Sequence, residues 1–471
     1  MLHVSTRGEA PVLGFADALL AGLARDGGLY VPKSWPSLTR ETIQGFAGKP
    51  YTSVAKAVLG PLVDGEIPDS ALGAMIDGAY ATFRHAAVCP LTQIGDNLFV
   101  LELFHGPTLA FKDVAMQLLG RLMDHVLKER GVRATIVGAT SGDTGSAAVD
   151  AFKGLDQVDI FILYPHGRVS DVQRRQMTTV DSPNVHALAV EGTFDDCQTM
   201  VKGMFNHARF RDELQLSGVN SINWARVAAQ AVYYFTAAVA LGSPHRPVSF
   251  SVPTGNFGDI LAGWVAKQMG LPIERLMIGT NANDILARTL QTGSYEIRGV
   301  QPTDAPSMDI QISSNFERLL FEAYGRDPAA VRRLMASLVQ SRSFTLDEEA
   351  LARIRREFAA TAVSEPDMAS EMTETYRTTG YVIDPHTAVG TRAGRALLKE
   401  QPEIPVVALS TAHPAKFPDA VRRATGIHPE LPPHMADLMA RSERFTVLPN
   451  DQKAVETFIR ERARAVRGVA A

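Results

Sequence analysis

The feature that most restricts the fold of this chain is a regular alternation of strands and helices that begins at Leu98 and continues for most of the sequence. Helical patterns such as Phe194–His207 and Trp224–Leu241 separate apolar runs that suit buried strands. The alternation predicts an α/β fold of parallel or mixed sheets flanked by crossover helices, whose ligands bind beyond the carboxyl ends of the strands. The predicted strands are Leu98–Leu103, Ala134–Ala139, Val158–Leu163, Val185–Val190, Val248–Val252, Leu276–Thr280 and Val406–Leu409.

Three segments depart from this alternation. Residues 1–95 have helical periodicity, which predicts a mostly helical N-terminal domain ahead of an α/β region at 96–471. Helical periodicity returns at Asp327–Tyr376, with a capping box expected at Thr345–Glu348, so we expect a helical insertion near 326–380. The tail, 432–471, is expected to form a helix, a short strand and a basic helix.

Composition excludes several classes of partner. The net charge of −4 gives no electrostatic reason to expect nucleic acid or an anionic membrane. The two cysteines, Cys89 and Cys197, have no metal-ligand spacing and are expected to be core thiols of a reduced protein. The longest apolar stretch, Val227–Leu241, is too short to span a bilayer and is expected to be a buried helix. With no signal-peptide pattern at its start, the chain is expected to be cytoplasmic.

Lys112 stands at a junction between a strand and a helix. The apolar run that ends at Leu103 is broken by Gly106 and Pro107, and a helical pattern opens at Asp113. A positive charge at the N-terminal end of a helix opposes the helix dipole, and a neutral or covalently linked lysine avoids that cost. Without further information, a solvated lysine is the commoner outcome at such a junction.

Two loops that follow predicted strands have the character of anion sites. Pro253–Gly258 leads into a helix, and its glycines let backbone amides converge at the helix N-terminus. The loop lacks the Lys-Ser/Thr ending of a nucleotide triphosphate loop. Thr140–Gly145 offers hydroxyls and glycine amides at the equivalent position of its own strand. The alternatives are ordinary turn geometry for the first loop and a helix cap at Thr144 for the second.

Motifs spread over most of the chain resemble the threonine synthase family, in its long-chain branch. The stretch His105-Gly-Pro-Thr-Leu-Ala-Phe-Lys-Asp113 is similar to the pyridoxal-phosphate lysine motif of that family. The resemblance implies a pyridoxal-phosphate-dependent fold type II (tryptophan synthase β-like) architecture, with two α/β subdomains in 96–471 behind the extra N-terminal domain. Other similar segments, in the family's order, are Ser5–Gly8, Asp26–Pro32, Thr140–Gly145, Asn220–Arg226, Pro253–Asp259, Ser313–Arg318 and Ser410–Phe417.

The resemblance also implies an activity, the conversion of O-phospho-L-homoserine and water to L-threonine and phosphate, the last step of threonine biosynthesis. The implied cofactor is pyridoxal 5'-phosphate in Schiff-base linkage to the catalytic Lys112, and no metal is expected. Implied cofactor-binding residues are Gly255, Asn256, Phe257, Gly258, the amide of Asp259, and Thr411 at the pyridine nitrogen. Implied substrate-binding residues are Thr140, Ser141, Ser221 and Arg226 at the phosphate and Thr144 at the carboxylate.

Some of these assignments have alternatives. The Asp259 side chain is expected to cap its helix, and the role of Asp143 stays open. Lys416 is interpreted as structural, with a contact to a phosphate as the alternative. The alternative for Arg226 is an ordinary ion pair with a carboxylate. A related phospho-lyase or dehydratase that releases 2-oxobutanoate is the alternative activity, and a catalytically silent ligand-binding relative is a second. The sequence does not predict the oligomeric state.

Overall fold

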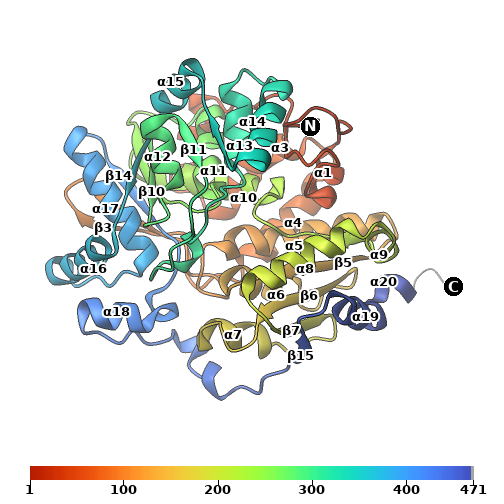
Figure 1. The fold of residues 1–471 in the computed structure, drawn as a ribbon. Helices are drawn as coiled ribbons and strands as arrows, with labels where there is room; N and C mark the ends of the chain where they lie inside the picture. The colour runs from red at the N-terminus through yellow and green to blue at the C-terminus, as the bar shows by residue number, and fades with distance from the viewer. Residues whose placement is uncertain (468–471) are drawn as a thin grey trace.

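Two sheets organise the structure (Figure 1). The computed structural model describes residues 1–467. The larger sheet has the strand order β13-β10-β9-β14-β4-β3, and the smaller has the order β15-β7-β6-β5-β8. Neighbouring strands are parallel throughout both sheets, except that β3 is antiparallel to β4. The predicted α/β fold with parallel and mixed sheets is therefore confirmed.

All seven strands predicted from apolar runs are present. The larger sheet consists of β3 (Leu91–Gly95), β4 (Leu98–Glu102), β9 (Val248–Pro253), β10 (Ile273–Thr280), β13 (Phe358–Ala362) and β14 (Val406–Ser410). The smaller consists of β5 (Ala134–Ala139), β6 (Val158–Pro165), β7 (Val185–Glu191), β8 (Leu216–Ser217) and β15 (Thr446–Pro449). Two antiparallel pairs are β1 (His3–Ser5) with β2 (Tyr30–Pro32), and β11 (Ser294–Glu296) with β12 (Ser343–Thr345).

Helices connect and cover the strands. Those before the larger sheet are α1 (Phe15–Ala21), α2 (Arg40–Gln44), α3 (Tyr51–Val63) and α4 (Asp69–Tyr80). The crossover helices are α5 (Lys112–Glu129), α6 (Asp143–Phe152), α7 (Asp171–Thr178), α8 (Phe194–Asn206), α9 (Ala208–Glu213), α10 (Trp224–Ala240), α11 (Gly258–Gln268) and α12 (Ile285–Thr292). Later helices are α13 (Phe316–Ala323), α14 (Pro328–Ser341), α15 (Glu348–Glu357), α16 (Glu365–Thr379), α17 (Pro385–Glu400), α18 (Pro418–Thr425), α19 (Gln452–Arg462) and α20 (Arg464–Arg467). Short 3₁₀ turns are η1 (Pro306–Met308), η2 (Pro414–Lys416), η3 (Pro433–Met435) and η4 (Leu438–Ala440).

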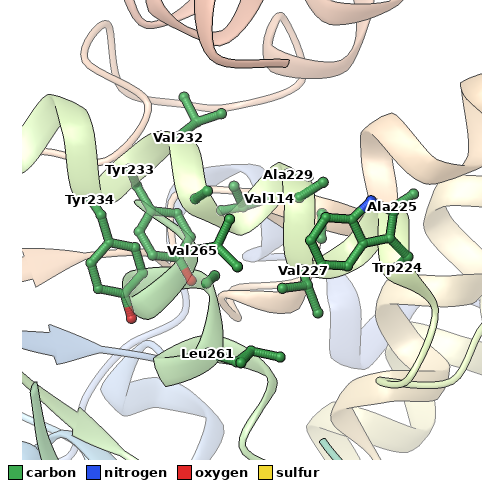
Figure 2. Close-up of a cluster of buried hydrophobic side chains, with 14 of the residues drawn as sticks. Val114, Trp224, Ala225, Val227, Ala229, Val232, Tyr233, Tyr234, Leu261 and Val265 are labelled. Carbon is green, nitrogen blue, oxygen red and sulfur yellow. The ribbon is translucent and has the colours of Figure 1, made fainter. Parts of the chain in front are cut away.

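Helix α10 forms the centre of the main hydrophobic core (Figure 2). Its side chains are buried on nearly every face, from Trp224 through Val232 to Val239. A helix that is apolar all round needs neighbours on every side, and α10 packs against α3, α5 and α11. This confirms the prediction of a buried helix at Val227–Leu241. No helix within residues 1–467 is both long and apolar enough to cross a membrane.

The N-terminal segment is attached to the rest of the protein by side chains of α13. Thr6 donates to Glu317 at 2.6 Å, and Arg7 forms an ion pair with the same carboxylate at 2.9 Å. Arg318 donates to the carbonyl oxygen of Tyr30 at 3.0 Å. Apolar residues of α3 and α4 also share one core cluster with α5 and α10. The segment is mostly helical as expected, and the domain boundary near residue 95 stays a prediction.

The helical interpretation of 327–376 was partly wrong. Helices α14, α15 and α16 are present, but two strands interrupt them, and β13 forms an edge of the larger sheet. Strand β13 was missed because Phe358 continues the four-residue apolar spacing of α15 from Ile354. The capping box was also wrong, since Thr345 belongs to β12 and the carboxylate of Asp347 caps α15 through the amide of Ala350.

The C-terminal tail completes the smaller sheet. Strand β15 pairs with β7, and Val455 and Ile459 of α19 lie in a core cluster with Phe161 and Leu188 of that sheet. The predicted strand and following helix are present. The helix expected at the start of the tail is absent from the described residues, where proline-rich sequence forms only the turns η3 and η4. Residues 468–471 of the predicted basic helix lie outside the described residues.

Candidate active site

The loops that follow β4, β9 and β14 meet at one cavity at the carboxyl ends of the larger sheet's strands. Residues from α6, α10, η1 and α17 complete its wall. This is the location expected for a ligand in a parallel sheet. The lining consists of Phe111, Lys112, Thr144, Ser221, Arg226, Gln230, Pro253, Thr254, Gly255, Asn256, Phe257, Gly258, Asp259, Ile260, Ser307, Met308, His386 and Thr411.

Lys112 is the first residue of α5 and is buried, so the alternative of a solvated lysine is wrong. Its Nζ lies 4.7 Å from the centre of the Phe111 ring and 3.5 Å from Oδ2 of Asp143. Burial lowers the pKa of Lys112 below its ordinary value, and the positive charges of Lys416 and Arg226 lower it further, against the attraction of Asp143. The neutral amine, which is the nucleophilic form of lysine, therefore forms more readily at Lys112 than at an exposed lysine.

Hydrogen bonds and a close backbone contact fix the shape of the loop at 254–258. The side chain of Asn315 donates to the carbonyl oxygen of Asn256 at 3.0 Å, and Ser313 Oγ donates to that of Gly255 at 2.7 Å. A Cβ atom at Gly255 would lie 2.9 Å from the backbone oxygen of Ser307, so this close approach requires glycine. The chain then enters α11, whose first amides have no partner within the helix, and its first three residues line the cavity, an arrangement that suits an anion.

Phe257 precedes α11 in the left-handed conformation, with φ of 63°. A non-glycine residue adopts this conformation only where its surroundings hold it. Its ring is buried against Phe316, at 5.3 Å between ring centres, and against Phe358, at 5.7 Å. The aromatic contacts therefore fix the turn that directs the amides of Gly258 and Asp259 toward the cavity.

The side chain of Asp259 does not cap α11, so that expectation was wrong. It is buried and accepts hydrogen bonds from the hydroxyls of Tyr233 and Tyr234 of α10. Its second oxygen, Oδ2, has no hydrogen-bond partner among the described residues. Burial raises the pKa of Asp259 to about 6, and the two tyrosine hydroxyls act in the opposite direction. Asp259 belongs to the α11 N-terminus that lines the cavity, and a neutral Asp259 would repel a phosphate there less than a carboxylate would.

The loop at 140–145 makes a smaller contribution to this cavity than expected. Thr144 lines it, whereas Thr140 and Ser141 are not among its lining residues. Thr140 Oγ1 instead accepts hydrogen bonds from the amides of Gly142 and Gly145, at 3.0 and 2.9 Å, and shapes the loop. The alternative of Thr144 as the helix cap is wrong, because α6 begins at Asp143.

Arg226 has the character of an anion-binding residue. It is buried in the first turn of α10 and donates from Nη1 to the carbonyl oxygen of Val219 at 2.9 Å. It has no ion pair among residues 1–467, and its Nε has no hydrogen-bond partner there. Burial lowers its pKa to about 10. A buried cation without a carboxylate, beside Ser221 and Lys112, fits a ligand that brings its own negative charge.

Of the two hydroxyls at the end of β14, only that of Thr411 belongs to a residue that lines the cavity. Ser410 Oγ is buried and forms a hydrogen bond with Oγ1 of Thr387 at 2.8 Å. The structure therefore distinguishes two adjacent residues that are equivalent in sequence terms.

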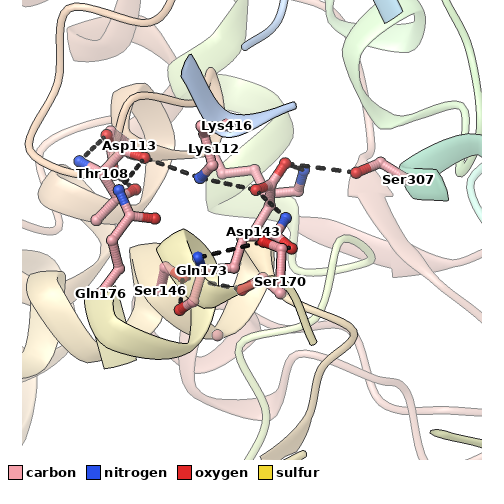
Figure 3. A network of polar contacts seen from close by, with 12 residues as sticks. Thr108, Lys112, Asp113, Asp143, Ser146, Ser170, Gln173, Gln176, Ser307 and Lys416 are labelled. Atoms are coloured by element: carbon pink, nitrogen blue, oxygen red, sulfur yellow. Dashed lines mark hydrogen bonds and ion pairs between the residues drawn. The ribbon is translucent and has the colours of Figure 1, made fainter. Parts of the chain in front are cut away.

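Several contacts around the lysine were not predicted from the sequence. Asp143 forms an ion pair with Lys416, which is fully buried, and also contacts Gln173 and Ser307 (Figure 3). Asp143 and Lys416 both lie within motifs that carry the family resemblance, but their contact joins residues far apart in the chain. No group of three histidine, cysteine, aspartate or glutamate side chains within 1–467 is arranged to hold a metal ion.

Comparison with known families gives this geometry a chemical class. The family described as pyridoxal-phosphate dependent enzyme matches residues 87–333, which contain Lys112 and the 254–258 loop. A buried guanidinium without an ion pair among residues 1–467, a buried lysine of lowered pKa and the N-terminal amides of α11 suit such a phosphorylated aldehyde. The fold and the cavity define a pyridoxal-phosphate-dependent enzyme.

Within this class, the chain belongs to the threonine synthase family. The families described as threonine synthase N terminus and threonine synthase, C-terminal match residues 2–80 and 387–459. A threonine synthase of Pseudomonas aeruginosa is 52% identical over 460 residues, covering 98% of each chain. The crystal structure of a threonine synthase from Brucella melitensis with bound pyridoxal phosphate has a TM-score of 0.96 and 62% identity, covering 98% of this chain and 100% of that one. Yeast threonine synthase has a TM-score of 0.93 and 40% identity, covering 98% of each chain.

Proposed function

We propose that this chain catalyses the conversion of O-phospho-L-homoserine and water to L-threonine and phosphate, using pyridoxal 5'-phosphate. The observation that carries the proposal is the presence of two positions for a phosphate in one cavity. One is formed by the amides at the start of α11, which have no partner within the helix, and the other by Arg226, which has no ion pair among residues 1–467. A phosphorylated cofactor with a phosphorylated substrate requires two such positions.

The proposed cofactor site consists of Lys112, the loop Gly255–Gly258, the amide of Asp259 and Thr411. Lys112 binds the aldehyde carbon of the cofactor, and the loop amides hold its phosphate. Thr411 would place its hydroxyl at the pyridine nitrogen, and because a hydroxyl carries no negative charge, it would leave that nitrogen largely unprotonated. When bound, pyridoxal phosphate supplies an electron sink that stabilises negative charge at the substrate's carbon atoms.

The proposed substrate site uses residues from helices α5, α6 and α10 and from the loop before α10. Arg226 and Ser221 bind the substrate phosphate, Thr144 binds the carboxylate, and Lys112 moves protons at the substrate's carbon atoms. Thr140 and Ser141 would bind the substrate phosphate only after the 140–145 loop turns toward the cavity. Ser221 and Arg226 would hold the departed phosphate next to the reacting carbon.

Quantifying both organic products tests this function. Purified protein with cofactor and O-phospho-L-homoserine is expected to give threonine and phosphate in equal amounts, and labelled water is expected to place its oxygen in the threonine hydroxyl. A predominance of 2-oxobutanoate would instead identify a phospho-lyase or dehydratase of the same fold.

We further propose a cytoplasmic location. Cys89 and Cys197 are both buried and unpaired, which suits a reducing compartment. The net charge of −4 gives no support for a nucleic-acid or membrane partner. Fractionation of cells of the source organism, with antibody detection of this chain, tests the location.

A further inference from the structure

One buried carboxylate is shared between two lysines beside the cavity (Figure 3). Nζ of Lys416 lies 2.7 Å from Oδ1 of Asp143, whereas Nζ of Lys112 lies 3.5 Å from Oδ2. The exposed fractions of the three side chains are 0% for Lys416, 4% for Asp143 and 11% for Lys112. The shorter ion pair belongs to the lysine that does not line the cavity.

The partners of this carboxylate divide between its two oxygens. Oδ1 also accepts a hydrogen bond from Nε2 of Gln173 at 2.8 Å, and Oδ2 accepts one from Oγ of Ser307 at 3.4 Å. Lys416 is fixed at a second point, because its Nζ donates to the carbonyl oxygen of Thr108 at 2.9 Å. Lys416 and Asp143 are therefore held together by the fold, while the contact to Lys112 is long.

One carboxylate cannot neutralise two buried ammonium groups, and an unpaired buried charge is costly. The other charged groups that bear on Lys112 are Arg226 of α10, which is positive, and Asp259 of α11. His386 of α17 also lines the cavity, and it contacts Asp384 at 2.8 Å. Burial raises the pKa of Asp143, but Lys416 and Lys112 outweigh this and hold it well below the ordinary value. The Asp143 carboxylate is therefore ionised, and its shorter ion pair is with Lys416.

We propose that Lys416 is a positioning residue: it holds Asp143 as its own counter-ion, so that Lys112 is left without a full counter-ion and can lose its proton. The inference rests on the proposed role of Lys112 as the cofactor lysine. A neutral Lys112 amine is the form that bonds to the cofactor aldehyde and the form that accepts a proton. Without Lys416, the same carboxylate would stabilise the protonated form of the Lys112 nitrogen.

The test is a pH titration of the holoenzyme followed by the absorbance of bound pyridoxal phosphate, which reports the proton on the Lys112 nitrogen. Lys416→Gln removes the charge while keeping a hydrogen-bond donor. It is expected to raise the titration midpoint by about one pH unit or more, since a counter-ion at this range shifts pKa values by roughly one to three units. Lys416→Arg keeps the charge and is expected to titrate near the wild-type midpoint. Lys416→Gln with an unshifted midpoint would overturn the proposal.

Two further variants keep the result interpretable. Lys399→Gln removes an exposed lysine of α17 and is the matched control, with no shift expected. If Lys416→Gln does not fold, the double variant Asp143→Asn/Lys416→Met removes both buried charges together. Its midpoint is expected at or below that of the wild type, and a higher midpoint would overturn the proposal.

The failure of this proposal can be distinguished from failure of the proposed function. Reduction of the holoenzyme with borohydride, followed by peptide mass analysis, identifies the residue that carries the cofactor. Absence of the adduct at Lys112 would contradict the proposed function itself. An adduct at Lys112 together with an unshifted Lys416→Gln midpoint would reject only the role of Lys416.

Discussion

The backbone N–H of Phe111 donates to the carbonyl oxygen of Thr411 at 2.8 Å. A β-bridge between Ala110 and Ala412 lies beside this bond. The residue before Lys112 is therefore joined through the main chain to the residue after β14. Side-chain flexibility cannot separate the two ends of the proposed cofactor site, because their spacing depends on backbone hydrogen bonds.

Lys112→Ala is expected to abolish attachment of the cofactor and to lower turnover by roughly 1000-fold or more, because the variant lacks both the covalent link and the proton carrier. Folding is expected to be retained, since alanine is a strong helix former at the start of α5. Cofactor absorbance, circular dichroism and threonine formation measure these effects. Lys128→Ala, at the exposed end of the same helix, is the control. Near wild-type threonine formation by Lys112→Ala would end the assignment.

Arg226→Leu is expected to impair use of O-phospho-L-homoserine while leaving the spectrum of bound cofactor unchanged. Loss of a charge-assisted contact to phosphate costs about 2 kcal/mol, or roughly 30-fold in kcat/KM. Steady-state kinetics with a parallel cofactor titration measure both effects. Arg422→Leu replaces an exposed arginine of α18 and is expected to change neither. If cofactor occupancy falls and substrate use per bound cofactor does not, Arg226 belongs to the cofactor site or to the fold.

Gly255→Ala is expected to weaken cofactor binding. The added methyl group would lie 2.9 Å from the backbone oxygen of Ser307 and 3.4 Å from Cα of Met308, so the loop must shift. Such overpacking costs about 1–3 kcal/mol, or about 5- to 150-fold in the dissociation constant of pyridoxal phosphate. Gly299→Ala, where the same methyl group meets no atom within 4 Å, is the matched control. Equal cofactor affinity in the two variants would show that the loop does not need this close approach.

Asp259→Asn is expected to make the protein more stable than the wild type, and increasingly so as the pH rises. The pKa of Asp259 is about 6 in the folded protein, above the value of about 4 for an unfolded aspartate, because burial disfavours its charge. The favourable contribution of its neutral form is therefore complete below pH 4 and is lost as the pH rises through about 6.

Urea unfolding of both proteins at pH 5 and pH 8, with saturating cofactor, measures this difference. The advantage of Asp259→Asn in the free energy of unfolding is expected to grow by roughly 1–2 kcal/mol between the two pH values. An advantage that is constant or decreases with pH would show that Asp259 is ionised throughout.

The sequence predicted the sheets because their strands are buried on both faces and therefore form continuous apolar runs. Strand β13 was not predicted for the opposite reason. It lies at a sheet edge, and its pattern Phe-Ala-Ala-Thr-Ala is compatible with the end of a helix. The loops at Lys112 and Gly255 were predictable because glycine, proline and polar residues follow apolar runs. Their meeting in one cavity then follows from the geometry of a parallel sheet.

Contacts between distant segments could not be predicted in this way. The ion pair of Asp143 with Lys416 depends on how η2 packs against α6, and the local sequence around either residue carries no signal for it. The hydrogen bonds of Asp259 to Tyr233 and Tyr234 depend on the packing of α10 on α11. A helix cap at Asp259 was the better prediction from local sequence alone, and tertiary packing overrode it.

The position of β14 between β9 and β4 has a consequence for the order in which the protein can be completed during its synthesis. The central part of the larger sheet is finished by a strand at residues 406–410, far toward the end of the chain. A nascent chain that has emerged only as far as α17 has β4 and β9 with a vacant strand position between them, and it has no Thr411. The proposed cofactor site is therefore complete only after nearly the whole chain has left the ribosome, and until then β4 and β9 expose unpaired strand edges of the kind that promote aggregation.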